Sequence, residues 1–313
     1  MTKTPVALFL YRRPRHTERM IESLRRCDGF DPSAVRVYCD GSRPGDDPAP
    51  VLATRAVARA LLGDGATFVE SDTNLGLAAS IIRGVSQVVE QHGRVVVVED
   101  DLLLHRQFLA FMSATLDRYA DEPAVMQGSG YMFPVSRFHG RKRAMFLPII
   151  SSQGWCTWKR AWRHFDPRAL GWEQLLLDRG LARRFDVGDS YYYTDLMRWQ
   201  MAGKLNTWGV RWYWSVFREG GCTLFPPQSL VTPQGTDGTG THGDLLWRLA
   251  PQARPAVPPV DSIELPSEVK VHPEDLSALQ RELWALSGGP FAPALRAVRR
   301  LRFVLRAARW QSA

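Results

Sequence analysis

The chain has 313 residues, 45% of them hydrophobic, which is enough for one large domain or two small ones with a sizeable core. Its net charge of +8 suits partners that carry phosphate, such as nucleotides, nucleic acids or anionic lipids, without choosing among them. No stretch is apolar over enough residues to cross a bilayer, we expect no signal peptide, and the four cysteines lack metal-ligand spacing. These features are typical of a cytoplasmic protein with reduced thiols.

The first hundred residues alternate between short apolar runs and amphipathic stretches. We expect strands at 6–10, 35–39, 66–70 and 95–98, with helices at about 14–26, 49–62 and 77–91 between them. This alternation predicts an α/β fold with a doubly wound, mostly parallel sheet and helices on both faces. Ligands of such sheets bind beyond the carboxyl ends of the strands.

The fourth strand carries the strongest chemical signal. Residues 95–98 are four valines, which predicts a strand buried on both faces, and Glu99, Asp100 and Asp101 follow directly. Acids gathered at the end of a buried strand repel one another unless a cation lies among them, and carboxylate oxygens suit Mg²⁺ or Mn²⁺. The alternative is a solvated acidic turn that caps the next helix.

Polar residues also follow the first two strands, at the same predicted edge of the sheet. Arg12 and Arg13 end the first strand, and Asp40 ends the second. The two arginines can also be read as a solvated surface, and Asp40 as an Asx turn with Gly41 and Ser42. The absence of GxGxxG after the first strand and of GxxxxGK[ST] anywhere excludes a dinucleotide fingerprint and a P-loop.

The second half reads as a mixed arrangement of helices and strands. We expect helices at about 108–119, 173–185 and 190–202, a helix through Trp162 into which residues 151–158 lead, and strands at 124–131, 145–150, 206–210 and 223–225. Residues 226–242 form a long Pro- and Gly-rich loop, which we expect to be either a lid over a site or disordered. Residues 251–275 resemble an extended strap, followed by a short helix at 274–286.

Several of these segments together resemble a known family. Residues 6–242 are similar to GT-A nucleotide-sugar glycosyltransferases, most of all to the branch typified by N-acetylglucosaminyltransferase I and its bacterial relatives. Residues 96–102 match the Glu-Asp-Asp variant of that family's DxD metal motif, and residues 74–78 match a turn before the helix under the donor. Residues 154–158 resemble a Gly-Trp segment around the sugar and acceptor. Residues 193–197 fall where the family carries its catalytic carboxylate, with one acid where the family typically has two.

The resemblance implies a role for each matching residue. Asp101 would bind the metal, while Glu99 and Asp100 would lie beside the ribose and the metal's waters. The remaining roles fall to Arg13 near the phosphates, Asp40 at the uracil or ribose, Asn74 at the donor, Gly154 and Trp155 at the sugar or acceptor, and Asp195 as the catalytic carboxylate. The implied domains are 1–245 for the GT-A unit (1–105 nucleotide-binding, 106–245 acceptor), 246–290 for the strap and short helix, and 291–313 for a terminal helix.

Some of these residues keep simpler interpretations. Asp195 can be an acid of a helix N-terminus or an ion-pair partner of Arg198. Trp155 and Trp158 can belong to the core. His242 is a candidate metal ligand or phosphate contact, and equally a solvent-exposed loop residue.

The C-terminal segment, residues 291–313, predicts a basic amphipathic helix. Arginines supply the polar face of this helix. Its apolar residues recur at intervals of three and four, and they are Leu295, Val298, Leu301, Leu305 and Ala308. Such a helix can bind an anionic surface at the inner face of the cell membrane, pack on its own domain or contact a partner helix.

The sequence therefore predicts a metal-dependent, inverting glycosyltransferase using Mn²⁺ or Mg²⁺. We expect it to move a hexosyl or N-acetylhexosaminyl group from a nucleoside-diphosphate donor, a UDP-sugar, to a hydroxyl of a glycan or lipid-linked glycan. One rival is a nucleotidyltransferase, although the Gly-rich, basic loop that such enzymes carry after the first strand is missing. The other is a non-catalytic basic binding protein. Nucleic acid is not an expected partner, because three acids at a strand end repel phosphates unless a metal is present.

Overall fold

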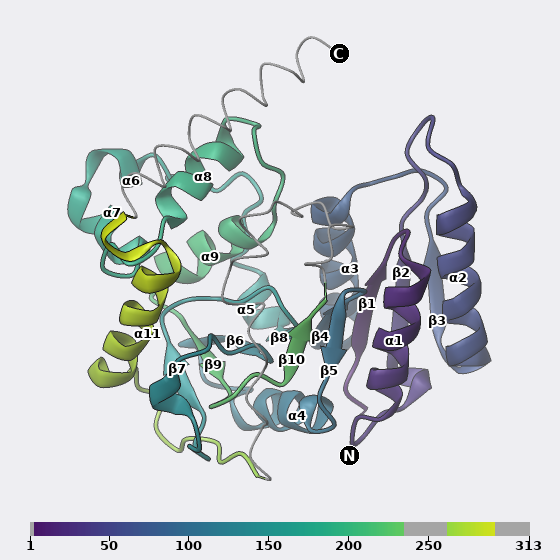
Figure 1. Ribbon diagram of the computed structural model, residues 1–313, viewed down its shortest axis with the longest axis horizontal. Coiled ribbons are helices and arrows are strands. Elements are labelled where there is room, and N and C mark those ends of the chain that lie inside the picture. Colours follow the sequence, from purple (N-terminus) through teal and green to yellow (C-terminus); the bar gives the residue numbers. More distant parts are fainter. Residues whose placement is uncertain (1–2, 235–261, 292–313) are drawn as a thin grey trace.

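A computed structural model describes residues 3–234 and 262–291 (Figure 1). In this part of the chain eight strands form one central sheet in the order β3-β2-β1-β4-β8-β6-β9-β7. The strands are β1 (Val6–Leu10), β2 (Val35–Cys39), β3 (Thr67–Glu70), β4 (Arg94–Glu99), β6 (Val125–Ser129), β7 (Met145–Leu147), β8 (Trp155–Trp158) and β9 (Cys222–Phe225). The helices are α1 (Pro14–Arg25), α2 (Ala49–Leu62), α3 (Leu77–His92), α4 (Phe108–Arg118), α5 (Lys159–Trp162), α6 (Gln174–Leu177), α7 (Arg179–Phe185), α8 (Tyr193–Met201), α9 (Gly209–Arg218) and α11 (Pro273–Leu286).

The first half of the sheet is parallel, as the sequence predicts. β1 pairs with β2 on one side and β4 on the other, and β2 pairs with β3. Alternate residues of β1 face opposite layers, because side chains of a strand alternate between the two faces of its sheet. Leu8 and Leu10 pack in the layer of α1 and α2, whereas Ala7 and Phe9 pack in the layer of α3. The predicted doubly wound α/β arrangement with helices on both faces is therefore confirmed.

The second half of the sheet is mixed. β8 runs antiparallel to β4 and β6, β9 runs parallel to β6, and β7 runs antiparallel to β9. β8 is absent from the sequence-based prediction, which leads residues 151–158 into the following helix. Trp155 pairs with Val97 and Trp158 with Arg94, so this strand is held by β4 across about sixty residues of chain.

Two further predictions are wrong in detail. The strand expected at 206–210 is instead a loop that enters α9 at Gly209, and Val210, Tyr213, Trp214 and Phe217 of that helix recur at helical spacing and pack in the core. The helix expected at 173–185 is divided into α6 and α7. It breaks at Asp178, whose backbone is extended and whose side chain accepts a hydrogen bond from the N–H of Leu181 as an N-cap.

A small antiparallel ribbon links the region after β4 to the segment near residue 230. It consists of β5 (Leu102–Leu104) and β10 (Val231–Pro233), which the sequence-based prediction leaves as loop. The N–H of Gln234 then donates to the carbonyl oxygen of Asp101 at 2.7 Å. The chain around residue 234 is thus fixed beside the acidic residues that follow β4.

The described part of the predicted strap lies along the edge of the sheet near β7. Glu264 exchanges backbone hydrogen bonds with Lys142 and Ala144, and the Tyr119 hydroxyl donates to the carbonyl of Pro266 at 2.6 Å. The short helix expected at 274–286 is confirmed as α11. None of the described helices combines the length and apolar character that crossing a membrane requires. The predicted amphipathic segment and His242 lie outside the described residues, apart from the first residue of that segment, Phe291.

Candidate functional site

The candidate site is built on the carboxyl end of β4. The four valines of this strand are completely buried, and the chain emerges from them at Glu99, Asp100 and Asp101. Burial raises the pKa of Glu99 well above its ordinary value, and the charges of Asp101 and Asp100 raise it further. Burial also raises the pKa of Asp100 to about 7, against the opposing charge of Arg13. Burial therefore disfavours the charged forms of these two carboxyl groups unless a cation lies beside them.

Arg13 is brought to these acids by the pairing of β1 with β4. Its Nη1 lies 3.2 Å from Asp101 Oδ2 and 3.6 Å from Asp100 Oδ1, and its side chain is 17% exposed. The backbone N–H of Tyr11 points at Asp100 Oδ2 at 3.4 Å. Parallel neighbours end at the same edge of a sheet, so the convergence expected from the sequence is present in the structure.

The side chains available as metal ligands decide whether a metal ion fits this site. Across residues 3–234 and 262–291, no group of three or more His, Cys, Asp and Glu side chains is arranged to hold a metal ion. Asp100 and Asp101 offer carboxylate oxygens, and Asp101 is the more accessible, with its side chain 30% exposed. Mg²⁺ and Mn²⁺ are commonly held by one or two carboxylates together with waters and substrate phosphates. The residues present fit a cation bound together with a phosphate ligand, rather than an all-protein cage.

Asp40 organises a second part of the site, the turn formed by residues 71–76, which we call the donor turn. Its Oδ1 accepts hydrogen bonds from the N–H groups of Gly41 and Leu75, at 3.0 and 2.8 Å. Its Oδ2 accepts from Asn74 Nδ2 and the N–H of Gly76, at 3.1 and 2.9 Å. These bonds use the roughly four acceptor positions of a carboxylate. Asp40 is more than a local Asx turn, because it ties the end of β2 to the turn before α3.

A shallow pocket opens beside the donor turn. Its lining includes Asp40, Ser71, Leu75, Ser80 and Arg83, from the ends of β2 and β3 and the start of α3. Because both oxygens of Asp40 already accept from the protein, this carboxylate shapes the pocket through the turn that it holds.

Gly154 and Trp155 are held within the core. Gly154 has φ of +60°, and a Cβ there would lie 2.9 Å from a Val231 side-chain carbon, so glycine is required. Trp155 is fully buried, and its ring stacks on Trp208 at 4.8 Å between centroids. With Trp158 also buried, the structure gives these tryptophans the core role that the sequence leaves open, and Trp155 has no exposed face for a sugar.

Asp195 lies in the first turn of α8 and is 7% exposed. Half-buried aromatic residues precede it, with Tyr191 and Tyr192 stacked at 4.4 Å. Figure 1 shows α8 at the end of the molecule toward which β1 and β2 run. Because β4 runs parallel to β1, the helix that carries Asp195 lies at the end of the molecule toward which β4 also runs.

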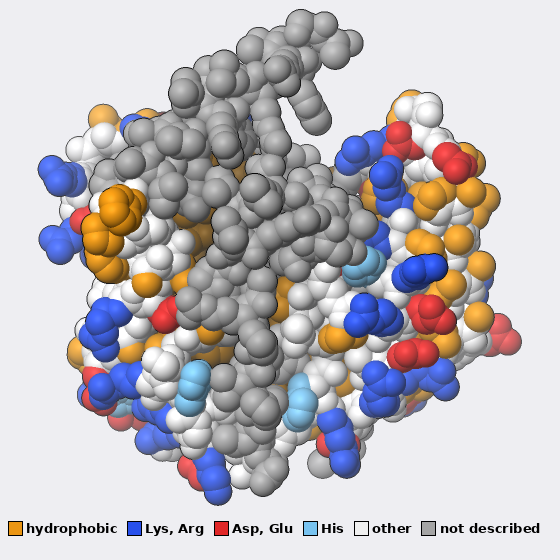
Figure 2. All heavy atoms as spheres, viewed as in Figure 1, with side chains coloured by type: hydrophobic (Ala, Val, Ile, Leu, Met, Phe, Trp, Pro, Cys, Tyr) orange, Lys and Arg blue, Asp and Glu red, His pale blue; other side chains and the backbone are white. Residues whose placement is uncertain are grey.

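The molecular surface is mixed in charge on the face shown in Figure 2, where Lys and Arg side chains alternate with Asp and Glu. Among the described residues, surface ion pairs such as Arg12–Asp46, Arg106–Asp28 and Arg137–Glu274 also join opposite charges. A nucleic-acid interface is expected to show a continuous basic stripe. The described part of this face does not show one.

Sequence reasoning missed Arg55. This residue of α2 contacts the ends of β2 and β3, with Nη2 2.6 Å from the carbonyl oxygen of Ser71. The signal was available, because Arg55 falls on the inner stripe of α2 with Val51, Ala58 and Leu62. A cation on the apolar stripe of a helix needs polar partners inside the fold.

Comparison with known proteins gives a distant likeness in fold. No family model matches the chain, and no curated protein matches its sequence. Among solved structures, the chain is similar to the mannosyltransferase PcManGT from Pyrobaculum calidifontis in complex with GDP-Man and Mn²⁺. That likeness has 15% identity and a TM-score of 0.45, over 99% of this chain and 81% of the other. Mouse xyloside xylosyltransferase 1, in its apo form, is similar with 13% identity and a TM-score of 0.35, over 70% and 83%. Likeness at this level does not identify the reaction of this chain.

Proposed function

We propose that this protein is a metal-dependent glycosyltransferase. It would transfer a hexosyl or N-acetylhexosaminyl group from a nucleoside diphosphate, with UDP as the expected nucleotide, to a hydroxyl of a glycan or lipid-linked glycan. The observation that carries the proposal is the contact of Arg13 with Asp100 and Asp101 at the carboxyl edge of the parallel sheet. One arginine against several acids leaves negative charge that a divalent cation can neutralise.

The chemistry requires a site that accepts a leaving diphosphate. The bond between the anomeric carbon and the diphosphate breaks, and the departing oxygen gains negative charge. A bound Mn²⁺ or Mg²⁺ would supply Lewis-acid neutralisation of that charge, with Asp101 as its ligand and Asp100 and Glu99 beside it. Arg13 uses Nη1 toward the acids, and a guanidinium has further N–H donors with which to bind a diphosphate oxygen.

The donor turn is the part of the site against which we propose that the nucleoside binds. Asn74 and the pocket beside Asp40 lie at the ends of β2 and β3, next to β1 and its Arg13 in the sheet order. In an open α/β sheet this edge is where ligands bind. We propose that the nucleoside lies against this turn while the diphosphate lies toward Arg13.

Asp195 is our proposed general base. The acceptor oxygen would form a bond to the anomeric carbon as the bond to the diphosphate breaks, and Asp195 would take the proton from the acceptor hydroxyl. A single displacement of this kind inverts the anomeric configuration. The location of α8 at the same end of the fold as the acids supports this role.

A turnover assay tests the proposal. The protein is incubated with UDP- and GDP-sugars, with and without Mn²⁺, and the released nucleoside diphosphate is measured together with transfer to glycan acceptors. We expect release that depends on Mn²⁺ and is lost in Asp195→Asn and Asp101→Asn, but kept in Asp117→Asn, whose side chain is 65% exposed on α4. Turnover that survives in Asp195→Asn would show that Asp195 is not the base. Pyrophosphate released from a nucleoside triphosphate and a sugar phosphate would instead favour a nucleotidyltransferase.

A further inference from the structure

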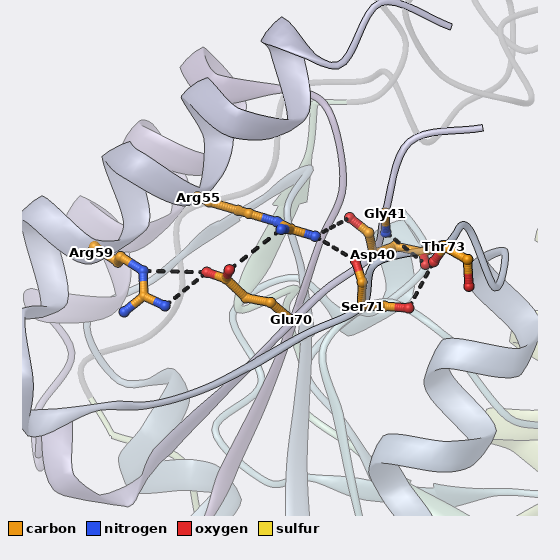
Figure 3. Close-up of polar contacts among 7 residues, drawn as sticks. All are labelled: Asp40, Gly41, Arg55, Arg59, Glu70, Ser71 and Thr73. Carbon is orange, nitrogen blue, oxygen red and sulfur yellow. Dashed lines mark hydrogen bonds and ion pairs between the residues drawn. The ribbon is translucent and has the colours of Figure 1, made fainter. Parts of the chain in front are cut away.

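Arg55 joins the ends of two strands that lie next to the candidate site (Figure 3). Its Nη2 donates to the carbonyl oxygen of Ser71 at 2.6 Å and to that of Asp40 at 3.3 Å. Its Nη1 donates to Glu70 Oε2 at 3.3 Å. The side chain is 16% exposed, so these bonds are made largely out of water.

The two carbonyls lie just beyond the last paired residues of β2 and β3, which are Cys39 and Glu70. There the strands leave the ladder, and the backbone is held by other bonds. The N–H of Ser71 donates to the carbonyl of Cys39 at 2.9 Å, and the N–H of Gly41 donates to that of Thr73 at 3.3 Å. Arg55 therefore satisfies carbonyl groups that the regular sheet no longer reaches.

The backbones approach so closely here that position 41 cannot carry a side chain. A Cβ on Gly41 would lie 2.6 Å from the carbonyl carbon of Thr73 and 2.8 Å from that of Asp72. Such packing tolerates little displacement of either strand end. A small movement at Asp40 would therefore be transmitted directly to the donor turn.

Asp40 completes the connection. Arg55 donates to the main-chain carbonyl of Asp40. The carboxylate of Asp40 accepts from the N–H groups of Leu75 and Gly76 and from the side chain of Asn74. Arg55 thus acts on the donor turn through one residue. The pocket lined by Ser71 and Leu75 takes its shape from this arrangement.

The ion pair with Glu70 does not account for Arg55. Glu70 also pairs with Arg59, at 2.9 Å between Oε1 and Nη2, and the Arg59 side chain is 55% exposed. Glu70 therefore keeps a cation partner when Arg55 is replaced, so charge pairing of Glu70 alone does not require Arg55. In addition, Nε of Arg55 is buried and finds no acceptor among the described residues, which is a cost to folding rather than a gain.

We infer that Arg55 is a positioning residue for the nucleotide donor, an inference that rests on the proposed function. It holds the ends of β2 and β3 at a fixed separation and thereby keeps Asp40 and the donor turn in the shape that binds the nucleoside. Loss of Arg55 should weaken nucleotide binding and raise the KM for the donor, with little effect on kcat, because the reacting groups lie on β4 and α8.

Arg55→Met and Arg59→Met form a matched pair for testing this inference. Both remove an arginine of α2 that pairs with Glu70, but only Arg55 touches the strand-end carbonyls. The readouts are the Kd for UDP and for GDP in the presence of Mn²⁺, and the hydrogen-exchange rates of the Leu75 and Gly76 amides. We expect Arg55→Met to raise the Kd about tenfold or more and to speed exchange at both amides, because charged hydrogen bonds to two buried carbonyls are lost. Arg59→Met should leave both readouts near wild type.

Arg55→Lys serves as the conservative variant and as the test if Arg55→Met does not fold. Lysine keeps the charge but lacks the planar fork, so it should restore binding only in part. Amide exchange at Leu75 and Gly76 that stays at the wild-type rate in both Arg55 variants overturns the inference. If the wild-type protein binds neither nucleotide, the proposed function fails instead, while the exchange rates still decide whether Arg55 holds the turn.

Discussion

Replacing Asp100 with asparagine should make the protein more stable at alkaline pH. The pKa of Asp100 is raised from 3.8 to about 7 in the folded state, chiefly by burial. The folded protein therefore retains a proton that the unfolded chain has released, and stability falls as pH rises from about 4 to 7. A pKa shift of one unit corresponds to about 1.36 kcal/mol. Above pH 7 the ionised carboxylate of Asp100 therefore lowers the free energy of unfolding by on the order of 4 kcal/mol.

Asparagine resembles the protonated acid in shape and carries no charge, so it removes this cost. In metal-free buffer, urea unfolding should give Asp100→Asn a gain of several kcal/mol at pH 8, a smaller gain at pH 6 and almost none at pH 4. Asp64→Asn, at an exposed acid in the short turn after α2, is the control and should show no such trend. A variant that is no more stable than wild type at pH 8 would refute the reasoning that this acid is destabilised by burial.

Three further substitutions test other parts of the structure. Arg13→Gln removes the cation beside Asp100 and should lower the free energy of unfolding by about 1 to 3 kcal/mol at pH 8. The loss should be smaller at pH 5, where that acid is protonated. An equal loss at both pH values, measured by urea unfolding, would contradict this. Gly41→Ala forces a methyl group against the backbone of Thr73 and should lower the thermal midpoint by several degrees. Trp155→Ala should cost about 3 to 5 kcal/mol because it empties a buried site, yet leave the nucleotide Kd of the folded fraction unchanged; a large rise in Kd would return Trp155 to the site.

The parallel half of the fold could be predicted because each of its strands and helices has a characteristic pattern within its own short stretch of sequence. The valines of β4 can hardly form anything but a buried strand, and the convergence of Arg13 with Asp101 follows from parallel pairing alone. In contrast, β8 depends on pairing with β4 across about sixty residues, and three-residue strands such as β5 and β10 carry no periodicity to detect.

Local patterns also misjudged some side chains. The stretch 206–210 predicts a strand because it is too short to show the helical recurrence that continues to Phe217 in α9. The donors to Asp40 include Asn74, Leu75 and Gly76, which lie more than thirty residues away, so its role in holding the turn is a tertiary property. Trp155 follows a glycine turn, as an exposed binding residue can, but the neighbouring aromatic ring of Trp208 comes from a distant segment.

The central claim is that the acidic end of β4 binds a divalent cation together with a nucleoside diphosphate. Calorimetric titration of Mn²⁺ into the protein, with and without UDP or GDP, measures this coupling directly. We predict that one nucleotide strengthens Mn²⁺ binding at least about tenfold, that Mn²⁺ strengthens nucleotide binding by the same factor, and that Asp101→Asn abolishes both effects. Nucleotide binding that is equally tight in EDTA, or Mn²⁺ binding that is unchanged in Asp101→Asn, would contradict the account.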